Sequence, residues 1–311
     1  MKNLQFTIIT FYQFKKNLNI DKLQILLKEL CSFYKIKGTI LLANEGINGT
    51  LAGLADPINI LEKDLKKAGY DNLEKKISFN NFMPFNRLKI KIKKEIVTFN
   101  DPNIDVENFK GKHVLYNDWN KLINNDDTVL IDVRNDFEIK VGTFKNSINP
   151  KTENFSSFKK YIKNNLEKYK SKKIAMFCTG GIRCEKASSY MIQKGFKNVF
   201  QLKGGIIEYL KNIKKKDSEW TGECFVFDNR VTVKNEMKIG TYELCHACRN
   251  LVSLSDRQLK SYEKGISCLN CKNLISKDKK IKLKERNKQI KIAKKKGLYN
   301  PYLKYTPSDF S

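Results

Sequence analysis

The first 95 residues show two alternating patterns of hydrophobic and polar positions. Apolar residues recur every third or fourth position over residues 21–34 and 57–68, which predicts two helices. Short apolar or alternating runs between these segments predict strands, at residues 4–12, 39–43, 47–51, 77–82 and 88–92. The turn Asn44-Glu45-Gly46 joins the second and third of these strands.

The order is strand, helix, two strands and helix, followed by the strands at 77–82 and 88–92. This βαββαβ-like order predicts a ferredoxin-like α+β domain over residues 1–98. The fold often binds RNA but serves other roles as well. Asn44, Glu45 and Asn48 are interpreted as turn residues chosen for backbone geometry, with a ligand contact as the alternative. Residues 99–125 follow as a connector that carries some structure.

A second region, residues 126–218, has the order of an α/β domain built on a parallel sheet. Short buried runs predict its strands, at residues 129–134, 173–177 and 199–202. Helical patterns lie at residues 157–169 and 184–194. Asp132 and Arg134 end the first strand, and charges at the carboxyl end of such a strand often border a site. Both are expected to brace the loop that follows the second strand, with a simple turn cap as the alternative for Asp132.

That loop carries the most distinctive chemistry in the chain. It reads Cys178-Thr-Gly-Gly-Ile-Arg-Cys-Glu-Lys-Ala, so a thiol, two glycines and an arginine lie between a strand and a helix. Gly180 and Gly181 let the backbone curl so that successive N–H groups point at one centre, an anion nest at a helix N-terminus. Together with Arg183, this nest predicts a lowered pKa and a nucleophilic role for Cys178.

The spacing within the loop separates the possible chemistries. Four residues lie between Cys178 and Arg183, which resembles the six-residue active loop of rhodanese-type sulfurtransferases. Phosphatases that form a cysteinyl-phosphate carry one more residue, which makes room for a tetrahedral phosphate. The shorter loop favours a persulfide on Cys178. Cys184 has two open interpretations, a resolving thiol or a small apolar residue at the helix start.

Residues 219–276 contain a predicted hairpin and two cysteine pairs. Alternating residues around Asp228-Asn229 predict the hairpin, with Arg230 at its tip as a candidate contact for an RNA phosphate. The cysteine pairs have the spacing that wraps four thiolates around zinc, so a zinc-ribbon-like module with four cysteine ligands is expected. Four free thiols are the alternative. The ligands would be Cys245, Cys248, Cys268 and Cys271.

The charge of the chain indicates a polyanionic partner. Lys and Arg number 60 against 33 Asp and Glu, a formal net charge of +27 that attracts phosphate backbones from a distance. Nucleic acid is the expected partner, although the base composition of the coding sequence also explains a lysine-rich chain. Residues 277–311 form a basic tail with a helix predicted at 285–296 and stopped by Gly297. An RNA-binding arm and a solvated tail both remain open for this tail.

Composition also excludes several classes of protein. No apolar run approaches the roughly 20 residues of a membrane span. The first residues lack a small-residue cleavage pattern and are interpreted as a strand, so the protein is expected in the cytoplasm. His113 and His246 are the only histidines, too few for a histidine-based metal oxygenase or a Ser-His-Asp site. The sequence contains no flavin or nicotinamide fingerprint.

Four motifs together carry a resemblance to a known family. They are Gly46-Ile-Asn-Gly-Thr, the Cys178 loop, Gly222-Glu-Cys-Phe-Val-Phe-Asp-Asn-Arg-Val and Cys245-His-Ala-Cys-Arg. With them the chain strongly resembles, over nearly its whole length, the bacterial tRNA uridine hydroxylases of the rhodanese superfamily. The central domain is therefore expected to be rhodanese-like.

The resemblance implies oxygen-dependent 5-hydroxylation of the wobble uridine, position 34, in a subset of tRNAs. It implies that Cys178 is the essential cysteine, with a persulfide as the suspected intermediate and the anticodon stem as the bound RNA. A plain persulfide sulfurtransferase, supplied by a small-molecule sulfur donor, is the runner-up because its loop would look the same. A non-catalytic RNA-binding protein is the third hypothesis.

Overall fold

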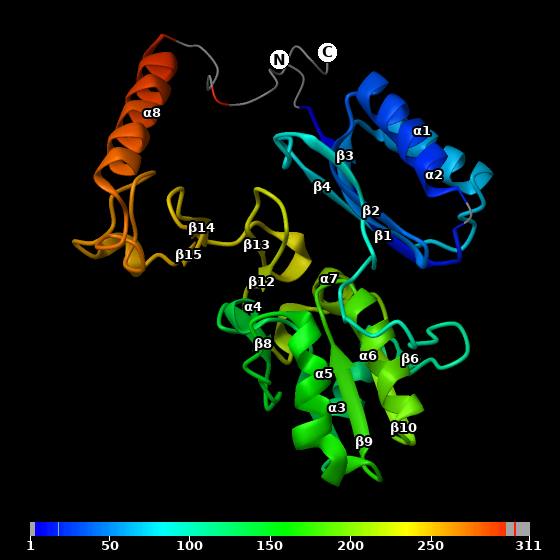
Figure 1. The fold of residues 1–311 in the computed structure, drawn as a ribbon. Helices are drawn as coiled ribbons and strands as arrows, with labels where there is room; N and C mark the ends of the chain where they lie inside the picture. The colour runs from blue at the N-terminus through cyan, green and yellow to red at the C-terminus, as the bar shows by residue number, and fades with distance from the viewer. Residues whose placement is uncertain (1–3, 18, 297–301, 303–311) are drawn as a thin grey trace. The chain divides into compact units, whose positions relative to one another are not determined.

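The computed structural model describes residues 4–17, 19–296 and 302 (Figure 1). The chain divides into two compact units. The first consists of Met1–Val226 with Val233–Lys238, and the second of Phe227–Thr232 with Ile239–Ser311. The first unit contains both predicted α/β regions, and the second contains the cysteine pairs.

A five-stranded sheet with two helices forms the N-terminal part of the first unit. The strand order is β4-β1-β3-β2-β5. The bounds are β1 Phe6–Phe14, β2 Lys37–Ala43, β3 Gly46–Gly53, β4 Glu74–Asn80 and β5 Leu88–Ile92. β1 pairs antiparallel with β3 and β4, whereas β5 lies parallel to β2. Helices α1 (Ile20–Phe33) and α2 (Ala55–Lys67) cover one face of the sheet, so the predicted ferredoxin-like arrangement is confirmed (Figure 1).

The alternation of apolar residues in β1 explains this packing. Ile9 and Phe11 lie on one face of the strand and share a core with Leu27 of α1 and Leu61 of α2. β1 runs two residues past its predicted end because Phe14 still pairs with Gly46 of β3. Gly46 has a φ of +147°, and a Cβ atom there would lie 2.1 Å from the carbonyl oxygen of Gln13, so the turn requires glycine.

A four-stranded parallel sheet forms the second part of the first unit. The strand order is β6-β10-β9-β7. The bounds are β6 Lys112–Val114, β7 Thr128–Asp132, β9 Lys173–Phe177 and β10 Asn198–Leu202. The helices that pack with it include α3 Tyr116–Ile123, α6 Ile182–Gln193 and α7 Gly205–Asn212. Two apolar cores enclose this sheet, as expected for a parallel sheet buried on both faces.

Two elements of this second part lie in the segment predicted as a connector. β6 pairs with β10, and α3 packs its Trp119 into the core that also holds Leu202 of β10. A strand of three residues is too short to show a period of two, which is why the pattern did not reveal it.

The helix predicted at residues 157–169 is present but changes its hydrogen bonding along its length. It starts with a 3-10 turn, continues as α5 (Phe158–Tyr161), widens to a π turn at Ile162–Leu166 and ends in a second 3-10 turn. Phe158, Ile162 and Leu166 all lie in one core at intervals of four residues. Side chains four positions apart lie on one face of a helix, so all three reach this core.

The predicted hairpin after residue 219 is shorter than expected. Only β12 (Cys224–Phe225) and β13 (Thr232–Val233) pair around Asp228-Asn229. The preceding strand, β11 (Trp220–Gly222), instead pairs antiparallel with β8 (Gly142–Phe144). Trp220 thereby packs against Phe144 and enters the core of the rhodanese-like part.

The second unit has little regular structure before its long helix. Two short strands, β14 (Glu243–Leu244) and β15 (Leu251–Val252), pair antiparallel. Helix α8 spans Lys277–Lys295, so the helix begins eight residues before the predicted start. Its N-cap Ser276 accepts a hydrogen bond from the backbone N–H of Lys279, a start signal that the dense lysines obscured. The predicted stop at Gly297 lies outside the described residues.

Within the described residues, no helix combines the length and the apolar character that a membrane crossing requires.

Candidate active site and cysteine cluster

Cys178 follows the last residue of β9, and the loop ends where α6 begins at Ile182. Its side chain is 1% exposed. The backbone N–H of Gly181 donates to the Cys178 sulfur at 3.2 Å. Gly181 has a φ of +101°, a region that favours glycine, so this residue type lets the peptide turn toward the sulfur.

The surroundings of Cys178 favour its thiolate. Burial raises the pKa of the thiol, but a hydrogen bond from Cys184, the positive charge of Arg183 and the backbone N–H groups of both residues lower it, to about 6. Above this pH the sulfur is mainly anionic. The structure thus brings together the glycine turn, the arginine and the nucleophile proposed from the sequence.

Arg183 is held by a carboxylate to which sequence reasoning assigned no role. Its guanidinium donates to both carboxylate oxygens of Glu138, at 2.8 and 2.9 Å, and both side chains are buried. Burial raises the pKa of Glu138, but the charge and hydrogen bond of Arg183, the charge of Arg134 and the Asn135 N–H together lower it overall. Glu138 sits in α4 (Asp136–Ile139), where its carboxylate also accepts a hydrogen bond from the backbone N–H of Asn135 at 3.1 Å. The Asn-x-x-Glu spacing is a sequence signal of a helix start that sequence reasoning did not use.

Asp132 and Arg134 form a fully buried ion pair next to the segment that carries Glu138. The guanidinium donates to both carboxylate oxygens of Asp132, with the shortest distance 2.6 Å. It also donates to the carbonyl oxygens of Glu138, at 3.4 Å, and Gly142, at 2.6 Å. The pair therefore braces the segment that carries Glu138, and it supports the Cys178 loop through that residue.

Cys184 lies at the start of α6 and is fully buried. Burial and the hydrogen bond to Cys178 raise the pKa of its thiol well above the usual value, so Cys184 stays protonated while Cys178 ionises. The structure thus makes Cys184 a hydrogen-bond donor to the thiolate. A resolving function for Cys184 stays a prediction.

Replacing Cys184 with alanine is expected to raise the pKa of Cys178, because the thiolate loses one of its donors. The rise should be measured by titrating protein labelled with carbon-13 at the cysteine Cβ atoms and following the Cys178 signal. Cys184→Ser is the matched control, since a hydroxyl restores a donor. An alanine variant that titrates like the parent protein would contradict the donor role.

Residues of the N-terminal sheet and the following segment also reach the helix after Cys178. Lys186 of α6 pairs with Glu45 at 2.8 Å and with Glu95 at 2.5 Å. Asn48 donates to the carbonyl oxygen of Ile96 at 3.0 Å. Glu45 lies in the turn before β3, as interpreted from the sequence, whereas Asn48 lies within β3, so its interpretation as a turn residue was wrong.

Glu185 connects the same regions through a buried polar network. It accepts a hydrogen bond from the Tyr12 hydroxyl at 3.0 Å and contacts the ring of His113 at 3.0 Å. Gln201 donates to its second oxygen at 3.0 Å. Sequence reasoning missed Tyr12, Glu185 and this use of His113, because no local pattern joins residues so far apart in the chain.

Arg230 does not occupy the exposed position that its expected RNA contact requires. Its guanidinium donates to both carboxylate oxygens of Asp228, at 2.6 to 3.1 Å, and both residues are buried. The expectation of an RNA contact at the hairpin tip was wrong, because the Arg230 guanidinium is buried and pairs with the Asp228 carboxylate.

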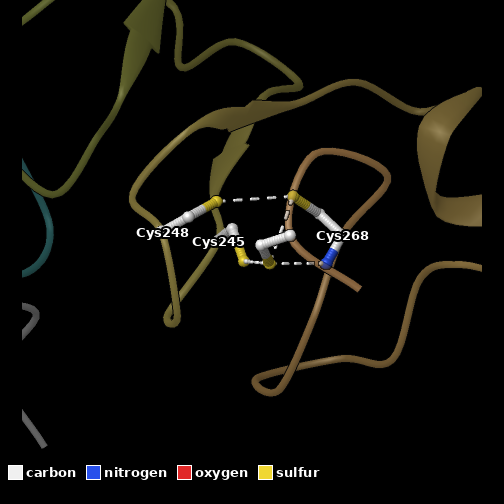
Figure 2. A group of neighbouring side chains, drawn as sticks. Cys245, Cys248 and Cys268 are labelled. Atoms are coloured by element: carbon white, nitrogen blue, oxygen red, sulfur yellow. Dashed lines mark hydrogen bonds between the residues drawn. The ribbon is translucent and has the colours of Figure 1, made fainter. Parts of the chain in front are cut away.

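The four cysteines of the second unit form a single cluster, and Figure 2 shows Cys245, Cys248 and Cys268 turned toward one another. Their sulfur atoms and that of Cys271 all lie within 4.8 Å of each other. Three sulfur pairs are 3.6, 3.7 and 3.9 Å apart. A tetrahedral zinc ion with Zn–S bonds of about 2.3 Å requires sulfur atoms about 3.8 Å apart, so this donor set fits the ion. His246 is not part of this group.

Comparisons with known proteins agree with this division of the chain. Residues 6–96 match the family model described as UPF0176 acylphosphatase like domain, and residues 116–212 match the Rhodanese-like domain. The tRNA uridine(34) hydroxylase of Pelagibacter ubique (strain HTCC1062) is 49% identical over 296 residues, which is 94% of this chain and 96% of that protein.

Two solved structures resemble a smaller share of the chain. A rhodanese-related protein from Thermoplasma volcanium is 25% identical, with a TM-score of 0.26, over 32% of this chain and 91% of that one. A protein from Staphylococcus saprophyticus subsp. saprophyticus is 23% identical, with a TM-score of 0.26, over 32% of this chain and 92% of that one.

Proposed function

Because the chain belongs to the tRNA uridine(34) hydroxylase family, we propose that it hydroxylates C5 of uridine 34 in tRNA and that Cys178 supplies the nucleophilic sulfur. The observation that supports this role is the buried Cys178 thiol, whose pKa is lowered to about 6 by the Cys184 hydrogen bond, Arg183 and the loop N–H groups. A sulfur in this state is an anion at neutral pH and therefore a nucleophile.

The proposed reaction starts with addition of the Cys178 sulfur anion to C6 of the uracil ring. The S–C6 bond forms as the C5=C6 double bond breaks, and the electron pair moves to C5 and the O4 carbonyl. C5 then donates this pair to dioxygen and forms a C–O bond. After the O–O bond is reduced, loss of the C5 proton restores the double bond and expels the sulfur from C6.

The balance of this reaction requires a reductant. One oxygen atom stays on C5 and the other leaves as water, which consumes two electrons and two protons. We assign their source to thiols, two of which give up these electrons and protons and become one disulfide. Dioxygen is then the oxidant and co-substrate, and the protein itself returns to its starting state.

The burial of Cys178 favours a persulfide as the form that reaches the base. The Cys178 side chain is 1% exposed. A second sulfur would place the reactive atom one S–S bond, about 2 Å, further out. The terminal sulfur would carry the anion in the same addition to C6. A small-molecule donor of sulfane sulfur would load it: the Cys178 thiolate attacks the outer sulfur of the donor, and the rest of the donor leaves as an anion.

Recognition of the anticodon stem-loop fits both the RNA chemistry and the charge of the chain. A wobble base lies in a loop and is splayed into a protein site more readily than a paired base. In the second unit, α8 carries exposed lysines along its length, at positions 277, 279, 282, 284, 288, 291, 294 and 295. The same helix lines a hollow of about 560 Å³ together with Lys264. We assign the phosphates of the stem to this surface.

The cysteine cluster is proposed to hold a structural zinc ion, with Cys245, Cys248, Cys268 and Cys271 as its ligands. Four thiolates close the coordination sphere, so the ion has no open position for substrate. Its contribution would be to stabilise the second unit and thereby to present the lysines of α8.

The proposed activity is tested with purified protein and unmodified tRNA, in air and without oxygen, followed by mass spectrometry of the digested nucleosides. We expect a gain of one oxygen atom on uridine 34 only in air, and isotopically labelled dioxygen should supply that atom. A sulfur-containing nucleoside would instead support the sulfurtransferase. Hydroxylation that proceeds equally without oxygen would contradict the proposed reaction.

A further inference from the structure

Lys76 extends from the N-terminal sheet to the Cys178 loop. It lies on β4, the edge strand of that sheet, and is 6% exposed. Its ammonium donates to the carbonyl oxygen of Gly180 at 2.6 Å and lies 4.9 Å from the centre of the Tyr12 ring. A buried lysine in contact with a loop carbonyl is uncommon, because the ammonium gives up its hydration for few partners.

The position of this contact within the loop gives it a chemical meaning. The Gly180 carbonyl and the Gly181 N–H belong to the same peptide group. The carbonyl oxygen accepts from Lys76, while the N–H donates to the Cys178 sulfur at 3.2 Å. A cation on the oxygen of a peptide group draws electrons from its nitrogen and makes the N–H a stronger donor, since hydrogen bonds in a chain polarise one another.

We propose that Lys76 is a positioning residue for the Cys178 site: by holding the Gly180 oxygen, it fixes and polarises the peptide group whose N–H stabilises the Cys178 thiolate. The inference rests on the proposed role of Cys178 as the nucleophile. Through Lys76, the N-terminal part of the chain contributes to activating the Cys178 sulfur.

The charged groups around Lys76 support a mutual stabilisation with the thiolate. The Lys76 ammonium interacts electrostatically with four acidic groups. They are Glu74 on the same strand, Glu185 of α6, Glu208 of α7 and Cys178. Burial lowers the pKa of Lys76, and these anions counteract that shift. Since the Cys178 thiolate favours the charged lysine, the charged lysine favours the thiolate by the same free energy.

The test is an equilibrium titration of Cys178 in the full chain, without tRNA or oxygen. Protein labelled with carbon-13 at the cysteine Cβ atoms is titrated, and the Cys178 signal is assigned by its absence from Cys178→Ser. We expect Lys76→Met to raise the pKa of Cys178 by about one unit, so that the thiolate fraction at pH 6 falls roughly fivefold. Lys76→Arg keeps a cation and a donor and should titrate close to the parent protein.

Lys75→Met is the matched control, because Lys75 is the adjacent residue on β4 and pairs with Glu62 on the surface. It should leave the Cys178 titration unchanged. If Lys76→Met does not fold, Lys76→Ala, which also removes both the donor and the charge, decides the question. A Cys178 titration that is the same in the folded methionine or alanine variant as in the parent protein overturns the inference. The titration does not measure hydroxylation, so its result can be interpreted even if the proposed function fails.

Discussion

Replacing Cys178 with serine is expected to abolish formation of 5-hydroxyuridine and to leave tRNA binding intact. The serine hydroxyl stays protonated at neutral pH, so the loop donors that lower the pKa of the thiol to about 6 have no anion to stabilise. Loss of a nucleophile costs on the order of a thousandfold or more in rate. Product is measured by nucleoside mass spectrometry and binding by gel retardation.

Two controls make this result specific to the sulfur. Cys31→Ala removes another buried thiol, whose pKa burial raises to about 12, and should keep the activity. The parent protein should lose activity as the pH falls through about 6, because protonated Cys178 can neither add to the base nor accept a sulfur atom from the donor. A serine variant that still hydroxylates tRNA would rule out Cys178 as the nucleophile. A serine variant that no longer binds tRNA would indicate a wider structural defect.

Removal of the proposed zinc ion, by a chelator or by Cys268→Ser, is expected to unfold the second unit while the first unit stays folded. Three of the seven buried residues in the core of the second unit are the cysteines Cys245, Cys268 and Cys271. So small an apolar core cannot supply the free energy of folding alone. Structural zinc contributes an apparent free energy on the order of 10 kcal/mol in small modules.

Metal content and limited proteolysis together test this second prediction. Zinc should be found in a ratio of one ion per chain, and its loss should expose the part after residue 239 to protease. Asn270→Ser, an exposed position between Cys268 and Cys271, is the matched control and should retain metal and resistance. Weaker tRNA binding is expected to accompany unfolding, because α8 carries the lysines assigned to the phosphates. Metal-free protein with an intact second unit would show that this unit folds without a metal ion.

The parts of the fold that sequence reasoning predicted are those with a local signal. Leucines at helical spacing identified α1, and the glycine pair before Arg183 identified the turn between β9 and α6. β6 escaped because three residues cannot display a period. The paired thiols at Cys245 and Cys248 have a spacing set by metal geometry, so their clustering with the second pair was readable without any knowledge of the fold.

The contacts that shape the site were less readable, because they join distant parts of the chain. Glu138 and Arg183 lie 45 positions apart, and Tyr12 and Glu185 lie 173 apart. Glu138 and Arg183 meet only when β7 and β9 pair in one sheet, and Tyr12 meets Glu185 only when the N-terminal sheet packs against α6. Lys76 illustrates the same limit, since one more lysine in a chain with 60 basic residues gives no sign that its side chain is buried.

The position of Lys186 bears on how this domain arrangement can be taken apart. The lysine belongs to α6 of the rhodanese-like part, is 1% exposed, and has both of its carboxylate partners in earlier segments, at Glu45 and Glu95. A fragment that begins at residue 99 would contain Lys186 without the carboxylates of Glu45 and Glu95. A buried ammonium without a partner is strongly destabilising. The rhodanese-like part is thus not an independent folding unit, because its helix α6 depends on ion pairs with the domain that precedes it.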